Sequence, residues 1–237
     1  MITEEYIDYE HNGTQLEGFL ARDDADDKPR PAVLIAHAWR GRSEFECDKA
    51  RELAKLGYAG FAMDLFGKGV LGSSVEENRQ LIQPFLDDRA LLQSRMGKAL
   101  ETLCAHSAVD ANKVVAIGFC FGGLCVLDLA RAGTDIGGVV SFHGLLGKPD
   151  NTAGTPIKAK VLVLHGHDDP MVPVDDVIAL ENELTETGAD WQIHVYGNTL
   201  HAFTNPEAND PDFGAVYNAD ADRRSWQALM NFLNEIL

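Results

Sequence analysis

Short apolar runs alternate with segments of helical periodicity along most of the chain. The runs are rich in Val, Ile, Leu and Ala, which is typical of strands buried in a parallel sheet. They are Pro31–His37, Tyr58–Met63, Val114–Ile117, Ile136–Phe142, Ala159–His165 and Trp191–Tyr196. Helices are predicted over Ser43–Leu56, about Val75 to His106, Leu124–Ala130, Val174–Thr187 and Ala219–Ile236. This alternation indicates an α/β fold with a mostly parallel central sheet of about eight strands and helices on both faces.

The N-terminal region has a different pattern. Residues 4–21 alternate loosely between apolar and polar and are interrupted at Asn12-Gly13. An Asn-Gly pair is a strong hairpin signal, so we expect an N-terminal antiparallel hairpin. Asp23 to Pro31 is predicted to be a loop, and Ser43 with Glu46 fits a capping box at the start of the first helix.

Composition narrows the possible partners and compartment. The formal net charge of −17 argues against nucleic acid or a membrane surface as partner, because both need a basic face. No apolar run is long enough to span a membrane, and the first residues lack the features of a signal peptide. The spacing of the four cysteines suggests neither a disulfide framework nor a metal site, so we expect free thiols and a reducing, cytoplasmic compartment. Residues 1–237 are expected to form a single domain.

The sequence Gly118-Phe-Cys-Phe-Gly122 stands between a predicted strand and a predicted helix. Its spacing matches the nucleophile elbow, with Cys120 where serine usually stands. Such a turn strains the backbone of the nucleophile, and side chains at positions 118 and 122 would collide with neighbouring elements. A thiol at a helix N-terminus is favoured as the thiolate. The alternative is that Cys120 is only a small buried side chain.

Two further polar groups follow later strands of the predicted sheet. Ligands of such folds lie at the carboxyl ends of the strands, and the order nucleophile, acid, histidine is that of α/β-hydrolases. Asp169 and His201 complete this order after Cys120. The neighbouring Asp168 is interpreted as a turn or capping group. His37 and His165 end buried strands, where local hydrogen bonds can satisfy them.

Each of these residues would have its own chemical role. Cys120 would attack an acyl carbon and form a thioester. His201 would take the thiol proton and later activate water, and Asp169 would fix the tautomer of the imidazole. The developing oxyanion needs fixed donors, for which we assign the backbone N–H groups of Phe121 and Trp39.

With these motifs the chain resembles the dienelactone hydrolase family, also called carboxymethylenebutenolidases. The resemblance covers nearly the whole chain, and it is carried by Gly118–Gly123, His165–Pro173 and Leu200–Phe203, with weaker support from Ala36–Trp39 and Gly57–Phe66. It implies an α/β-hydrolase fold without a large cap domain and a Cys-Asp-His triad. It also implies a cytoplasmic enzyme that uses no cofactor and is a monomer or a loose homodimer.

Two positions depart from the pattern of family members that degrade dienelactone. Those members carry a glutamate after the third strand that helps to form the thiolate, whereas this chain has Ala38. They also use an arginine shortly after the catalytic histidine, where this chain has Asn205, and a second carboxylate-binding arginine maps near Arg79. Without one of the two arginines, binding of a carboxylate is weakened, so we expect that the pocket does not prefer an anionic lactone. Whether Glu44 or Glu46 replaces the missing glutamate stays open.

Turns near the predicted site carry aromatic side chains. They are Trp39, Phe66, Phe121, His143 and Phe203. Each alone could be core packing, but together they favour a neutral, aromatic-lined pocket. The expected activity is hydrolysis of carboxylic esters or lactones, with neutral activated aryl esters preferred over dienelactone itself.

Other functions fit parts of the pattern. The same cysteine could hydrolyse neutral aryl phosphotriesters, because the small Ala38 leaves room for a tetrahedral centre. A cysteine peptidase is disfavoured by the elbow and the chain order. A redox role for Cys120 with Cys125 ranks lower, since their spacing is not C-x-x-C. The alternative of another class is a non-catalytic relative that binds a small ligand, although all three triad residues are present.

Overall fold

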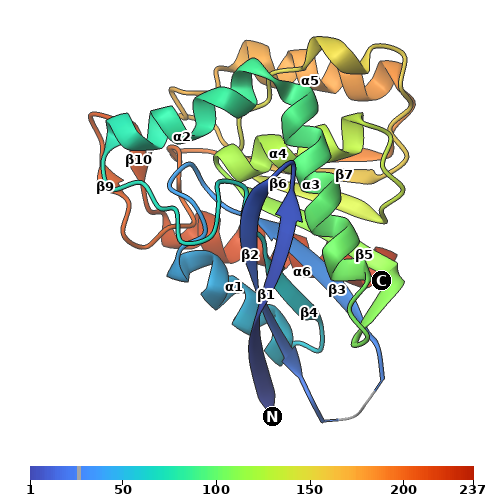
Figure 1. Cartoon of the computed structure of the whole chain (residues 1–237). Helices are drawn as coiled ribbons and strands as arrows, with labels where there is room; N and C mark the ends of the chain where they lie inside the picture. The colour runs from blue at the N-terminus through green and yellow to red at the C-terminus, as the bar shows by residue number, and fades with distance from the viewer. Residues whose placement is uncertain (26–27) are drawn as a thin grey trace.

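The computed structural model describes residues 1–25 and 28–237 (Figure 1). Its described part is organised around an eight-stranded sheet of order β1-β2-β4-β3-β5-β6-β7-β8. The strands are β1 (Ile2–His11), β2 (Thr14–Asp23), β3 (Arg30–Ala36), β4 (Ala59–Ala62), β5 (Val109–Phe119), β6 (Gly138–Phe142), β7 (Lys160–Gly166) and β8 (Trp191–Tyr196). Neighbours from β4 to β8 in this order pair in parallel, whereas β2 is antiparallel to both β1 and β4. The predicted sheet is therefore confirmed.

The N-terminal hairpin turns at the predicted place. Asn12 and Gly13 both have positive φ, 50° and 77°, which a two-residue hairpin turn of the favoured hand requires. The predicted loop after the hairpin is shorter than expected, because β2 continues through Asp23 and β3 already begins at Arg30. Residues 26–27 of that loop lie outside the described residues.

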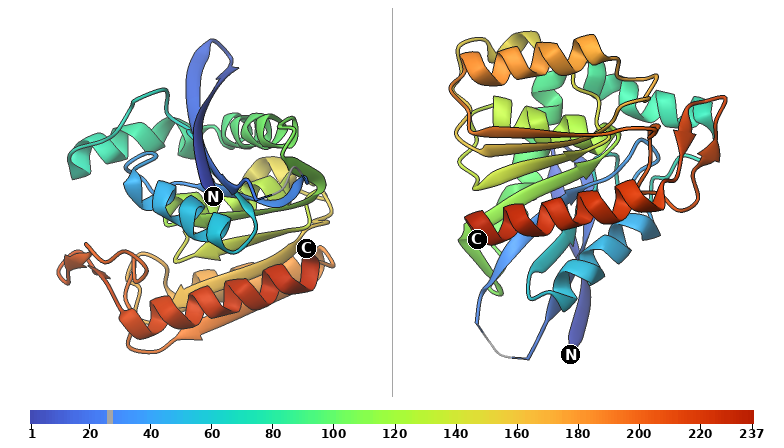
Figure 2. Two further views of the ribbon diagram at one scale, coloured as in Figure 1. Left: turned by 90° about the horizontal axis from the view of Figure 1, so that it is seen from below. Right: turned by 180° about the vertical axis from the view of Figure 1, so that it is seen from behind.

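Helices cover both faces of the sheet (Figure 2). On one face lie α1 (Glu44–Lys55) and α6 (Ala219–Ile236), and on the other lie α2 (Val75–Asp87), α3 (Arg89–Cys104), α4 (Phe121–Arg131) and α5 (Val174–Glu186). The helical stretch predicted from Val75 is broken at Asp88, whose side chain accepts the Leu91 N–H and so caps α3.

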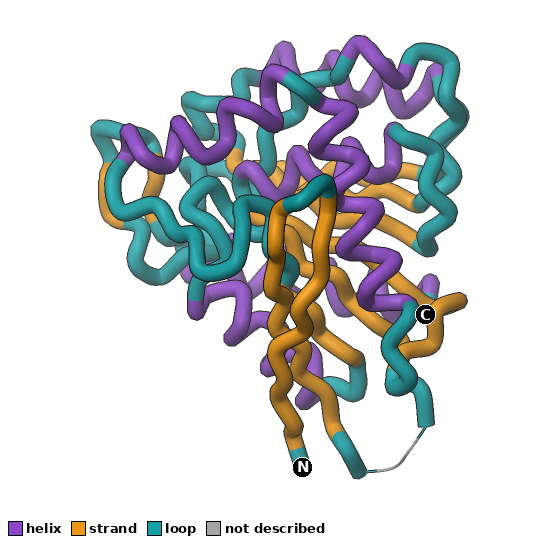
Figure 3. The backbone as a smooth tube through the Cα atoms, in the orientation of Figure 1, coloured by secondary structure: helices purple, strands orange, loops and turns teal. Residues whose placement is uncertain are grey.

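Three short elements were not predicted. They are η1 (Asp150–Thr152), β9 (Asn209–Asp210) and β10 (Ala215–Val216). Each strand of the β9–β10 ribbon has two residues, which is too short to give a periodic signal. It lies beside the loops that follow the parallel strands, on the left in Figure 3. The carboxyl ends of these strands meet there, as expected for a ligand site of an α/β sheet.

Candidate active site

Cys120 is the single residue between β5 and α4. Its backbone has φ 55° and ψ −116°, a strained conformation for a residue with a side chain. The turn is also crowded, because a Cβ at Gly118 would lie 2.0 Å from the carbonyl oxygen of Gly122, and one at Gly122 would lie 2.2 Å from that of Ala36. The two glycines are therefore required by close approach of the backbone. Every residue of α4 is buried, so the helix that begins behind Cys120 is held in place.

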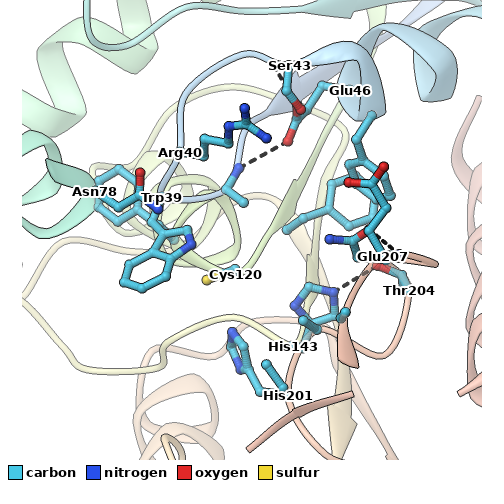
Figure 4. A pocket seen from close by; sticks show the side chains of 18 of the residues that line it. Trp39, Arg40, Ser43, Glu46, Asn78, Cys120, His143, His201, Thr204 and Glu207 are labelled. Carbon is cyan, nitrogen blue, oxygen red and sulfur yellow. Dashed lines mark hydrogen bonds between the residues drawn. The ribbon is translucent and has the colours of Figure 1, made fainter. Parts of the chain in front are cut away.

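A cavity of about 1040 Å³ opens at Cys120. Of the residues predicted for the pocket and the oxyanion donors, Ala38, Trp39, Phe121, His143 and Asn205 line it. His201 lines it as well. Figure 4 shows Trp39 and Asn78 on one side of Cys120, with Thr204 and Glu207 on the other.

Three residues predicted for the pocket do not line it, so these predictions are wrong. Phe66 lies behind the wall, where its ring stacks on that of Phe121. Phe203 is fully buried and packs edge-on against Tyr196 and His143. Arg79 is exposed on α2, next to the buried Asn78 that does reach the cavity. Phe66 and Phe203 pack in the core, whereas Arg79 lies on a part of the α2 surface that faces away from the cavity.

His201 and Asp169 are brought together from loops after β8 and β7. The His201 Nδ1 lies 2.7 Å from Asp169 Oδ2, and both residues are buried. The Met171 N–H donates to the other carboxylate oxygen at 2.9 Å, which fixes the carboxylate. Asp168 has the expected structural role, because its side chain accepts the Thr199 N–H at 3.0 Å and holds the histidine loop.

The second ring nitrogen of His201, Nε2, is buried and has no well-aligned hydrogen-bond partner among the described residues. Figure 4 shows the His201 ring below the Cys120 sulfur, and both residues line the cavity. Burial lowers the pKa of His201, but the negative charges of Cys120 and Asp169 and hydrogen bonding to both outweigh it and raise the pKa to about 10. The surroundings of His201 thus favour its imidazolium form.

His143 forms part of the wall next to His201, with ring centroids 5.2 Å apart. Burial, assisted by the charge of His201, holds the pKa of His143 well below its usual value, so this ring is neutral. Its Nε2 lies 2.8 Å from the Thr204 hydroxyl. His143 therefore offers the cavity a polar but uncharged surface.

The two residues assigned as oxyanion donors both lie at the cavity. Phe121 begins α4, and Trp39 lies in the turn after β3. Both residues line the cavity, and within the described part of the chain neither backbone N–H donates a hydrogen bond. Their N–H groups are thus available, and their role as oxyanion donors stays a prediction.

Several residues that line the cavity were not predicted from the sequence. They are Asn78 and Ile82 of α2, together with Leu145, Met171 and Phe213. The Phe213 ring stacks on Trp39 at 5.7 Å. The N-cap at Ser74 and the four-residue spacing of Asn78 and Ile82 could have placed these two residues on one face of α2. The sequence does not show which face of this helix meets the site.

The sheet order, the elbow after β5 and the acid and histidine loops after β7 and β8 define an α/β-hydrolase. The chain belongs to the dienelactone hydrolase family, whose pattern matches residues 16–237.

Solved structures agree with this assignment. The dienelactone hydrolase-like promiscuous phosphotriesterase P91 from metagenomic libraries is 37% identical, with a TM-score of 0.94 over 99% of this chain and 98% of its own. A structure named m3DLH is also 37% identical, with a TM-score of 0.94 over 100% of this chain and 99% of its own. The Caenorhabditis elegans protein K02A2.1 is 37% identical over 155 residues, which are 63% of this chain and 96% of that protein.

The described residues show neither a group of metal ligands nor a helix that could cross a membrane. Within residues 1–25 and 28–237, no three His, Cys, Asp or Glu side chains are grouped so that they could hold a metal ion. No helix in the same residues is both long and apolar enough to cross a membrane.

Proposed function

We propose that this hydrolase cleaves neutral activated esters or lactones, with Cys120 as nucleophile, His201 as general acid and base, and Asp169 as the group that orients His201. The observation that carries this proposal is the 2.7 Å contact between His201 and Asp169, which leaves the other ring nitrogen free beside the elbow cysteine. The same elements support a single catalytic domain over residues 1–237.

The first half of the reaction makes a thioester. The Cys120 thiolate attacks the carbonyl carbon, and the oxyanion that forms is met by the N–H groups of Phe121 and Trp39. The ester C–O bond then breaks, and the leaving oxygen takes the proton from His201 Nε2. Asp169 keeps the proton of His201 on Nδ1, so that Nε2 is the nitrogen that exchanges protons.

The second half hydrolyses the thioester. Acylation removes the negative charge of the sulfur, which is a main cause of the raised pKa of His201, whereas burial still lowers it. The neutral imidazole can therefore take a proton from water, whose oxygen attacks the acyl carbon. Breakage of the C–S bond releases the acid and restores the thiolate and imidazolium. In this mechanism His201 alternates between imidazolium and neutral imidazole, and the cysteine is activated by His201 without a glutamate at position 38.

The charge of the cavity wall supports neutral substrates. Its carboxylates outnumber its cationic groups, with Glu44, Glu46, Asp48, Glu52, Glu207 and Asp210 against Arg40, Lys49 and the imidazolium of His201. An anionic lactone would be repelled by this excess. Apolar side chains such as Trp39, Ile82 and Phe213 line the remaining wall and suit an aryl group.

A second candidate activity is hydrolysis of neutral aryl phosphotriesters. It is favoured by the 37% identity to P91, which is described as a promiscuous phosphotriesterase. The Cys120 thiolate would attack phosphorus, the aryloxide would leave, and the phosphoryl oxygen would occupy the same two-donor hole. Water must then attack phosphorus to release the cysteine. Trapping of one phosphoryl group on Cys120 without further turnover would count against this activity.

The proposal is tested by p-nitrophenyl acetate hydrolysis with wild type, Cys120→Ala and Cys104→Ala. Cys104 is a partly buried thiol at the end of α3, outside the cavity, and serves as the matched control. We expect kcat/KM to fall about 10³-fold or more in Cys120→Ala and to stay within twofold in Cys104→Ala. Equal rates in the wild type and Cys120→Ala would rule out this nucleophile. Rates no faster than the uncatalysed reaction in both proteins would favour a non-catalytic, ligand-binding protein.

A further inference from the structure

A buried carboxylate on α1 is connected to the turn after β3. Glu46 is 2% exposed and uses both of its oxygens. Oε1 accepts the Ala38 N–H at 3.2 Å, and Oε2 accepts the N–H and the hydroxyl of Ser43 at 2.9 and 2.8 Å. One side chain thus holds both ends of the segment 38–43, which we call the donor loop because it contains Trp39.

The peptide that joins Ala38 to Trp39 is held by a second set of hydrogen bonds, which involves His37. The Leu65 N–H donates to His37 Nε2 at 3.2 Å, so the ring proton of a neutral His37 lies on Nδ1. Burial lowers the pKa of His37, which keeps the ring neutral. Its Nδ1–H donates to the Ala38 carbonyl at 2.7 Å, and the Gly41 N–H donates to the same oxygen at 3.2 Å.

These contacts determine where the Trp39 N–H points. The Ala38 carbonyl and the Trp39 N–H belong to one planar trans peptide and face opposite directions. The carbonyl is fixed against His37 and Gly41, so the N–H is turned away from them. Trp39 lines the cavity, and its N–H is unused within the described residues.

We propose that Glu46 is a positioning residue, whose carboxylate fixes the donor loop so that the Trp39 N–H meets the oxyanion. This inference rests on the proposed function. Both carboxylate oxygens are occupied by the loop, so the role of Glu46 is exerted on the transition-state oxyanion and not on formation of the Cys120 thiolate.

A comparison within the chain separates this role from ordinary helix capping. Glu77 makes comparable bonds at the start of α2, where it accepts the N–H and the hydroxyl of Ser73, the residue before the N-cap Ser74, at 2.8 and 2.5 Å. Glu77 is exposed and does not line the cavity. Burying a carboxylate is costly, and a cap does not require it. What Glu46 adds is burial and the bond to Ala38.

The test compares Glu46→Ala and Glu46→Gln with Glu77→Ala as the matched control. Two rates are measured, p-nitrophenyl acetate hydrolysis and alkylation of Cys120 by iodoacetamide, which forms no oxyanion. In Glu46→Ala we expect kcat to fall about 10- to 100-fold with little change in KM, because only the transition state loses a donor. Alkylation should stay within twofold. Glu46→Gln keeps an oxygen for the Ala38 N–H and should lose about threefold in kcat. Glu77→Ala should change neither rate.

An unchanged kcat in Glu46→Ala, or a parallel fall of hydrolysis and alkylation, would overturn the proposal. If Glu46→Ala does not fold, Glu46→Gln decides, because a parallel fall of both rates in that variant contradicts the positioning role, as does an unchanged kcat. Failure of the proposed function itself would appear separately, as full activity of Cys120→Ala.

Discussion

Two buried clusters of charged side chains lie at opposite ends of α4. At its start, His201 and Asp169 meet at 2.7 Å beside Cys120. At its end, Arg131 and Glu183 also meet at 2.7 Å, and both residues are buried. Distance and burial do not distinguish the two pairs.

The clusters differ in how completely their polar atoms are satisfied. Arg131 donates to both oxygens of Glu183, to Asp128 and to the carbonyls of Leu146 and Gly147. Asp128 in turn receives two bonds from Arg89, at 2.6 and 2.7 Å. His201, by contrast, lines a cavity, and its Nε2 has no well-aligned hydrogen-bond partner among the described residues. A network whose polar atoms are bonded to one another joins helices, whereas a polar atom without such a bond at a cavity wall is available to a substrate. We call the pair of His201 and Asp169 the open cluster, and Arg131 with Glu183 and Asp128 the closed cluster.

The largest effect should come from altering the open cluster. In Asp169→Asn, the amide can keep an oxygen toward the Met171 N–H and present its NH₂ to His201, which then carries its proton on Nε2. We expect kcat/KM to fall about 10³- to 10⁴-fold while the protein stays folded. Steady-state kinetics and a urea melt check this outcome. A loss of less than tenfold would mean that Asp169 does not orient His201.

The closed cluster should respond in the opposite way. Arg131→Met leaves the Glu183 and Asp128 carboxylates buried without Arg131, and we expect a loss of about 3–5 kcal/mol in the free energy of unfolding. Below the new melting range, kcat should stay within about threefold. Urea unfolding and kinetics on the same sample measure both. A stable variant with strongly reduced kcat would show that this cluster is part of the chemistry.

A smaller effect concerns the charge state of Cys120. The raised pKa of His201, about 10, means that its imidazolium persists through neutral pH and loses its proton only as the pH approaches that value. Alkylation of Cys120 in the wild type should therefore be nearly flat between neutral pH and about pH 9. His201→Asn removes this imidazolium, so alkylation of Cys120 at neutral pH should slow about tenfold and recover as the pH rises. Identical profiles would remove His201 as the partner of the thiolate.

Much of the fold could be predicted because local signals and topology agree. The buried runs, the Asn12-Gly13 turn and the capping residues each indicate a single element. Cys120, Asp169 and His201 could be selected because each follows a strand, and β5 to β8 are neighbours in the sheet. The structure adds the contact between Asp169 and His201, while the catalytic roles stay predictions.

The cavity wall could not be predicted in the same way. Phe66 and Trp39 both follow strands, but only the packing of Phe66 on Phe121 sends it behind the wall. Glu46 could be assigned to a capping box, yet its bond to Ala38 exists only because α1 folds back over the turn after β3. Such choices depend on contacts between distant segments, which no local pattern encodes.

If the proposed mechanism holds, Cys120 carries the acyl group between two half-reactions. The acyl group can be located by mixing the enzyme with p-nitrophenyl acetate, quenching in acid within the first turnover and analysing the peptides by mass spectrometry. We expect one acetyl group on the peptide that contains Cys120, formed at the rate of the p-nitrophenol burst and absent in Cys120→Ala. An acetyl group on another residue, or turnover without any acylated peptide in the burst phase, would contradict it.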